Sequence, residues 1–136
     1  MRHTESAEQQ AVIQFANLHW WGPLLLMIPN GVYLSGNAKT RAIRGRRLKA
    51  EGLRPGAPDL LLAYPHRSLA GCWLEMKAAD GRTTAQQRDY HAMLVRAGYC
   101  VHVCHGADSA IAQLKTYLGY RLIHPPPDWP AVRHVA

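Results

Sequence analysis

Three apolar segments placed around one helical segment restrict the fold more than any other feature of this chain. "DLLLAY" and "GCWLEMK" are predicted strands joined by only the seven residues 65–71, which indicates an antiparallel hairpin. A helix predicted over "TAQQRDYHAMLVRAG" separates the second strand from a third, "YCVHVCH". Because strand–helix–strand units cross over right-handed, the second and third strands are expected to be parallel.

Three segments before this unit also carry recognisable patterns. An amphipathic helix is predicted over residues 4–21, with Thr4 as its N-cap. "PLLLMIPNG" is predicted to be a short buried strand closed by a Pro-Asn-Gly turn. "NAKTRAIRGRRLKAEG" is a candidate basic helix that ends at Gly52, where a left-handed cap suits glycine.

The chain closes with a helix and a proline-rich segment. "DSAIAQLKTYLG" is predicted to be a helix with Asp108 as its N-cap and Gly119 past its end. The sequence therefore predicts an α/β domain over residues 1–120, with a small central mixed sheet flanked by helices. Residues 121–136 are expected to form an extended tail that packs loosely or not at all.

Composition limits the class of protein. A chain of 136 residues with 48% hydrophobic and 18% charged residues is expected to fold as one globular domain. The N-terminus is polar, and the longest apolar run, "PLLLMIP", is far shorter than the ~20 residues that span a bilayer. With three cysteines and no disulfide pattern, we expect a soluble cytoplasmic protein with reduced thiols and no membrane contact.

The positive charge is concentrated in one segment. The net charge is +7, and the segment from residue 39 to 54 holds one acidic residue, Glu51. Its basic residues are Lys39, Arg41, Arg44, Arg46, Arg47, Lys49 and Arg54. Such a stripe suits a polyphosphate partner, above all nucleic acid, although an acidic protein, anionic lipid or plain solvent would also suit it.

Asp59, Glu75 and Lys77 form a candidate catalytic group. Because side chains alternate along a strand, Glu75 and Lys77 share one face of theirs, and Asp59 begins the partner strand of the hairpin. Paired carboxylates bind Mg²⁺ or Mn²⁺, and a nearby lysine can position water or steady developing charge during phosphodiester hydrolysis. The alternative is a cross-strand charge pair on a solvated face.

Several motifs together carry a family resemblance. "GAPD", then "LEMK", then "GRTTAQQ" heading a helix that ends "LVRAGY", resemble the VRR-NUC nucleases of the PD-(D/E)XK superfamily, especially their compact phage and bacterial stand-alone members. The resemblance runs from about Glu8 to Leu118. It implies a restriction-endonuclease-like core and a divalent-metal-dependent DNA endonuclease.

The resemblance also implies roles for individual residues. Asp59 and Glu75 would be metal ligands, with Met76 in the same ligand set, and Lys77 would be the catalytic lysine. The metal would be Mg²⁺ or Mn²⁺. The basic segment lies between the first predicted strand and the hairpin, where its charges would hold DNA phosphates; the candidate DNA-binding residues are Lys39, Arg41, Arg44, Arg46, Arg47 and Lys49.

Two further roles have an explicit alternative. Gln87 would help position the nucleophile or the lysine, but Thr84-x-x-Gln87 is also a capping box for a helix N-terminus. Glu8 matches the family's first-helix glutamate, which completes the metal site. Glu8 is the predicted residue, and Glu5, three residues earlier on nearly the same helix face, is the alternative.

Partners and substrate follow from the resemblance alone. Compact members of this kind tend to form homodimers that act on branched DNA such as four-way junctions, in the cytoplasm of a prokaryotic or phage-infected cell. Trp20, Trp21, Tyr33 and Leu34 are candidates for a dimer face, with core packing as the alternative for the tryptophans. The competing functions are a nuclease for ordinary duplex or single-stranded DNA and a DNA-binding module without catalysis.

The strand "CVHVCH" raises the possibility of zinc. Period-two alternation puts Cys100, His102 and Cys104 on one face and His105 on the other. No second cluster of comparable strength supplies a fourth ligand, so the sequence does not favour zinc. None of the eight histidines is assigned a catalytic role.

Overall fold

A four-stranded mixed sheet forms the centre of the molecule, in a computed structural model that describes residues 2–29 and 36–131. The strands lie in sequence order: β1 (Leu25–Met27), β2 (Leu60–Leu62), β3 (Cys72–Lys77) and β4 (Cys100–His105). β1 and β2 are antiparallel, as are β2 and β3, whereas β3 and β4 are parallel. The predicted hairpin and crossover are confirmed.

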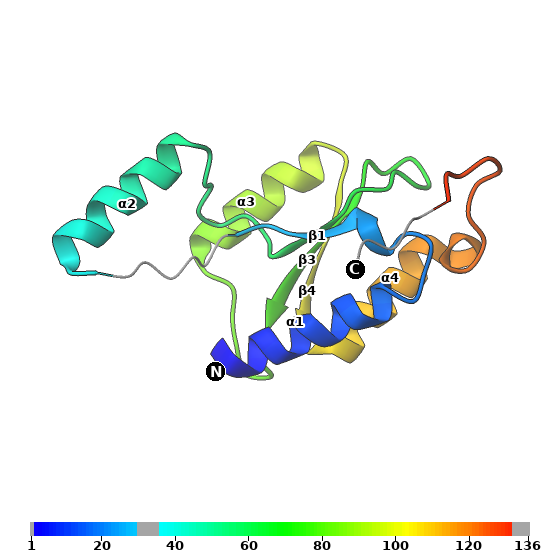
Figure 1. The fold of residues 1–136 in the computed structure, drawn as a ribbon, viewed down its shortest axis with the longest axis horizontal. Coiled ribbons are helices and arrows are strands. Elements are labelled where there is room, and N and C mark those ends of the chain that lie inside the picture. Colours follow the sequence, from blue (N-terminus) through cyan, green and yellow to red (C-terminus); the bar gives the residue numbers. More distant parts are fainter. Residues whose placement is uncertain (1, 30–35, 132–136) are drawn as a thin grey trace.

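Four helices accompany the sheet. α1 (Arg2–Ala16) and α4 (Ala107–Leu118) pack together on one face, and α3 (Ala85–Arg96) lies on the other (Figure 1). α2 (Ala38–Ala50) stands away from the sheet and buries none of its side chains. Two short 3₁₀ helices, η1 (Gly22–Leu24) and η2 (Gly119–Leu122), follow α1 and α4. Within the described ranges, no helix is long and apolar enough to cross a membrane.

The hydrophobic core lies between the sheet and the α1–α4 pair. Alternation along β3 turns Cys72, Leu74 and Met76 toward this core. Val12 of α1 and Leu114 of α4 pack against them, and all five side chains are almost completely buried. The other face of β3, with Trp73, Glu75 and Lys77, is therefore turned toward α3.

The first helix differs from its prediction at both ends. α1 begins at Arg2, so Thr4 lies inside the helix and is not its N-cap. The helix ends at Ala16, and His19 donates its backbone N–H to the Ala16 carbonyl oxygen in the turn that follows. Asp108 is likewise not the N-cap of α4, because Gly106 occupies that position.

The two tryptophans after α1 are packing residues. Trp21 is fully buried, and its indole Nε1 donates to the Leu122 carbonyl oxygen at 3.0 Å. The half-buried Trp20 donates to the Arg121 carbonyl oxygen at 2.7 Å, and its ring packs edge-on against Trp129. Core packing is thus the correct interpretation of Trp21, and Trp20 packs in part against the segment that follows α4.

The same contacts correct the expectation for the proline-rich segment. Residues 121–129 pack against the domain, because Arg121, Leu122 and Trp129 contact Trp20 or Trp21. The predicted turn at Asn30 and Gly31 and the dimer-face candidates Tyr33 and Leu34 lie outside the described residues.

Candidate active site

Two carboxylates meet where β2 begins beside β3. The antiparallel register pairs Leu60 with Leu74, so Asp59 lies across from Glu75 on the face that looks toward α3. The Asp59 Oδ2 atom accepts a hydrogen bond from the Met76 backbone N–H at 2.8 Å. The sheet itself therefore fixes the position of Asp59.

Glu75 is buried, with 2% of its surface exposed. Burial raises the pKa of its carboxyl group, and the hydrogen bond and negative charge of Asp59 raise it further, whereas Lys77 acts in the opposite direction. Two adjacent carboxylates taken out of water are stable only when a proton or a cation lies between them. The pair is thus a site that favours positive charge.

His91 of α3 contacts this pair, and sequence reasoning missed it. Its Nε2 atom lies 3.0 Å from Oε1 of Glu75. Burial, followed by the charge of Lys77, lowers the pKa of His91, which favours the neutral ring. In its Nε2–H tautomer this ring would donate to the Glu75 side chain. His91 comes four residues after Gln87 on the helix, and this spacing is the signal that could have identified it.

The face of α3 that packs on the sheet holds fewer apolar residues than helical spacing alone indicates. Tyr90 and Leu94 are half-buried beside His91. Helical spacing favours the same face for Met93 and Ala97, but Met93 is 60% exposed and Ala97 is exposed as well. The inner face is therefore more polar than the pattern of apolar residues indicates.

The two glutamates of α1 lie in different surroundings. Glu8 accepts a hydrogen bond through Oε2 from the Ala107 backbone N–H at 2.6 Å, at the N-terminus of α4. Glu5 accepts through Oε1 from the Ala78 N–H at 3.3 Å, directly after β3, and its charge contributes to the raised pKa of Glu75. Glu5 thus acts on Glu75 through its charge, while Glu8 binds a free backbone N–H at the N-terminus of α4.

Lys77 and Met76 differ in what they offer the site. Lys77 ends β3 on the same face as Glu75, and its charge acts on both Glu75 and His91. The Met76 side chain is buried on the opposite face, so only main-chain atoms of Met76 can contact a metal ion held by Glu75.

Gln87 belongs to a complete capping box. The Thr84 hydroxyl oxygen accepts from the Gln87 backbone N–H at 3.1 Å, and Gln87 Oε1 accepts from the Thr84 N–H at 2.9 Å. The predicted capping box is confirmed, and it determines how the Gln87 side chain is oriented at the start of α3.

The basic helix, α2, stands away from the sheet that carries the carboxylate pair (Figure 1). The Asn37 side chain accepts from the Thr40 N–H at 2.9 Å and caps α2. Every candidate DNA-binding residue is on the helix and exposed, namely Lys39, Arg41, Arg44, Arg46, Arg47 and Lys49. Arg47 also pairs with Glu51 at 3.1 Å, in an ion pair open to solvent.

A cavity of about 440 Å³ connects the end of the basic helix with the sheet. Leu48 and Leu53 line it on the α2 side, and Trp73 of β3 and Tyr90 of α3 line it on the other. Trp73 shares the strand face of Glu75, so the cavity opens onto the same face of the sheet as the carboxylate pair. The buried Trp73 Nε1 atom has no hydrogen-bond partner among the described residues.

Comparison with known proteins agrees with this geometry. No curated protein sequence matches the chain. A solved structure described as a VRR_NUC domain protein shares the fold, with a TM-score of 0.69 over 85% of this chain and 88% of the other, at 21% identity. The model of the VRR-NUC domain matches residues 6–108. The match spans most of the chain and contains both carboxylates, so the chain belongs to the VRR-NUC family and carries its nuclease-type domain.

Proposed function

We propose that the protein is a divalent-metal-dependent DNA endonuclease whose active site is the Asp59–Glu75 pair. The observation that carries this proposal is the pair itself: two carboxylates from adjoining strands, one of them buried, with a lysine on the same face. A solvated cross-strand charge pair does not account for a glutamate that is 2% exposed.

The donor set fits Mg²⁺ or Mn²⁺. Asp59 and Glu75 offer hard carboxylate oxygens, and Glu5, next to Ala78, is the nearest candidate for a third. When bound, the ion would polarise a phosphodiester oxygen and acidify a coordinated water. His91 would hold the Glu75 carboxylate in one orientation through its Nε2–H donor. Glu8 then acts in folding, through its hydrogen bond at the N-terminus of α4.

Lys77 and Gln87 supply the remaining polar groups. The Lys77 ammonium would hold the attacking water or offset the negative charge that develops on the phosphate. Gln87 would add a hydrogen bond at the start of α3, in addition to its capping role.

The exposed α2 helix is the proposed DNA-binding element. Its six basic side chains would contact phosphates, which fix the position of DNA without reading its sequence. A cavity lies between the end of α2 and Trp73, which shares its strand and strand face with Glu75.

Branched DNA is the proposed substrate class and a homodimer the proposed assembly, both on the family resemblance. A two-fold dimer would present two such sites to the two strands that are cut in a four-way junction. The test is cleavage of end-labelled four-way junction, flap and linear duplex with Mg²⁺, Mn²⁺ or a chelator. Metal-dependent cleavage that favours the junction supports the proposal, and equal cleavage of linear duplex replaces it with a general nuclease.

A further inference from the structure

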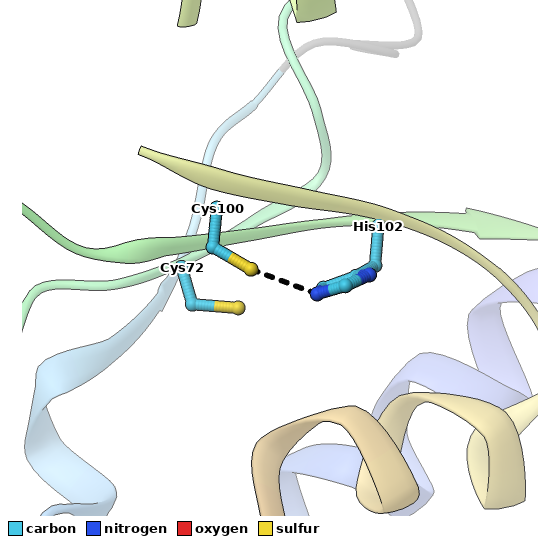
Figure 2. Close-up of side chains that lie close together, drawn as sticks. All are labelled: Cys72, Cys100 and His102. Carbon is cyan, nitrogen blue, oxygen red and sulfur yellow. Dashed lines mark hydrogen bonds between the residues drawn. The ribbon is translucent and has the colours of Figure 1, made fainter. Parts of the chain in front are cut away.

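Cys72, Cys100 and His102 converge on the core face of the sheet, away from the carboxylate pair. The parallel register pairs Cys72, which begins β3, with Cys100, which begins β4. His102 follows two residues later on the same strand face, and Figure 2 shows the two sulfurs and the imidazole ring directed toward the same region. Across the described residues, this is the group of three ligand atoms that lies within 4.8 Å.

The distances in this cluster suit a shared metal ion. Zn–S and Zn–N bonds of about 2.3 and 2.1 Å in a tetrahedron place sulfur and nitrogen roughly 3.5 Å apart. Cys100 Sγ lies 2.7 Å from His102 Nε2, and all three ligand atoms lie within 4.8 Å of one another. The required separation lies between these values, so small side-chain rotations suffice to accommodate the ion.

A cavity next to the cluster supplies space for a fourth ligand. It measures about 190 Å³ and is lined by Cys100 and His102 together with Gln113 and Tyr117 of α4. The Tyr117 hydroxyl donates to the Tyr64 carbonyl oxygen at 2.7 Å, so it is already engaged. The Gln113 side chain or a water molecule remains for the fourth position, and three protein ligands plus one exchangeable ligand form a known zinc arrangement.

We propose that Cys72, Cys100 and His102 form a second metal site, which binds one Zn²⁺-type ion. The ion would join the first residue of β3 to the first and third residues of β4. Thiolate and imidazole ligands prefer such ions, whereas Mg²⁺ prefers the carboxylate oxygens of the other face. Glu75 lies three residues along β3 from Cys72, so the ion would stabilise the strand that carries the nuclease residues. Binding releases the two thiol protons to solvent.

The ligand set differs from the four residues considered from the sequence. His105 hydrogen-bonds through Nδ1 to the Ala78 carbonyl oxygen at 2.9 Å, on the opposite strand face. Cys104 is buried, and its Sγ contacts the His102 carbonyl oxygen rather than the cluster. Both residues therefore provide matched controls on the same strand.

The test is Co²⁺ titration of the reduced, chelator-treated full-length protein, followed by optical absorption. The native protein should bind about one thiolate-coordinated Co²⁺ per chain, with sulfur-to-cobalt charge transfer and the strong visible bands of tetrahedral Co²⁺. Cys100→Ser and His102→Gln should lose or markedly weaken these bands, whereas Cys104→Ser, His105→Gln and Asp59→Ala should keep them. Excess Zn²⁺ should displace Co²⁺ and raise the Tm of the native protein but not of Cys100→Ser.

Three results would overturn this proposal. One is that the fully reduced native protein, with no Cys72–Cys100 disulfide, shows no thiolate-to-cobalt charge-transfer absorption when Co²⁺ is added. Another is retention of the full spectrum by both ligand variants. The third, which needs no variant to fold, is a native Tm that does not respond to Zn²⁺.

Discussion

Glu75 is the residue on which the proposed chemistry depends most, because the fold buries its carboxyl group next to a second one. Asp59 is placed by a backbone hydrogen bond from Met76, and Glu75 is held by His91. These restraints keep the two groups together despite their mutual repulsion. Under the proposed function, this arrangement costs stability in the metal-free protein, and a bound cation would restore it.

The raised pKa of Glu75 predicts how stability depends on pH. In the unfolded chain the group ionises near 4.5, whereas in the native protein it remains protonated to a higher pH, so above 4.5 the native state binds more protons. Relative to Glu75→Gln, the free energy of unfolding of the native sequence should therefore fall by about 1–3 kcal/mol between pH 5 and pH 8 in chelator. Urea denaturation at both pH values measures this difference. Parallel pH dependence in the two proteins would contradict it, and Mg²⁺ should reduce the effect.

His91 should act through Glu75 rather than on the substrate. We expect His91→Ala to lower metal-dependent cleavage about 10–100-fold and to raise the Mg²⁺ concentration needed for half-maximal rate, because Glu75 loses its orienting donor. DNA affinity measured in chelator should be unchanged. The matched control is Asp89→Asn, an exposed position on the same helix. An unchanged Mg²⁺ requirement in His91→Ala would show that the hydrogen bond is only structural.

At the residue scale, the sequence predicted neighbours that follow from the order of the strands, but not contacts that depend on tertiary packing. Asp59 and Glu75 were predicted to lie close together because the strands before and after a short connection form a hairpin. The choice between Glu5 and Glu8 depends on how α1 lies across the end of β3, which no local pattern records. The partner of Cys100 is Cys72, on a different strand, and alternation along β4 cannot reveal it.

The α2 helix is the element whose proposed role is easiest to isolate. Because it buries no side chain, Arg41→Gln, Arg46→Gln and Lys49→Gln together should change the free energy of unfolding by less than about 0.5 kcal/mol per substitution. DNA binding should weaken, and the slope of log K against log salt should become shallower by about 0.9 for each lost phosphate contact. Fluorescence anisotropy over a salt series measures both quantities.

A charge-matched control is available on another helix. Arg96→Gln removes one positive charge from the exposed end of α3. If this single change alters the salt slope as much as each α2 substitution does, net charge rather than α2 is responsible. An unchanged slope in the α2 triple variant would remove α2 from the DNA interface.

Elements were predicted more reliably than their ends. β3, β4, α2, α3 and α4 follow from alternation, helical spacing and caps. The end of α1 was placed too late because Trp20 continues the helical spacing, although the chain has turned there to bury Trp21. Tertiary packing of the tryptophans onto residues 121–129 decides both that boundary and the order of the proline-rich segment.

In the whole molecule, one face of the small sheet carries the proposed catalytic residues and the other face packs into the core. If the protein is a two-fold dimer, light scattering at working concentration should give about twice the chain mass of 15.2 kDa. A mass near 15.2 kDa would exclude a stable dimer and with it paired cleavage by one assembly.

The most direct test of the central claim compares the native protein with Asp59→Ala and Lys77→Ala for Mg²⁺-dependent cleavage and for binding of the same labelled four-way junction. Both variants should lose cleavage by at least about 100-fold while their DNA affinity in chelator stays within about threefold of the native value. Two results would contradict the assignment of the Asp59–Glu75 pair as a nuclease active site. One is that both variants cleave the junction at the native rate, and the other is that the native protein binds DNA without cutting it.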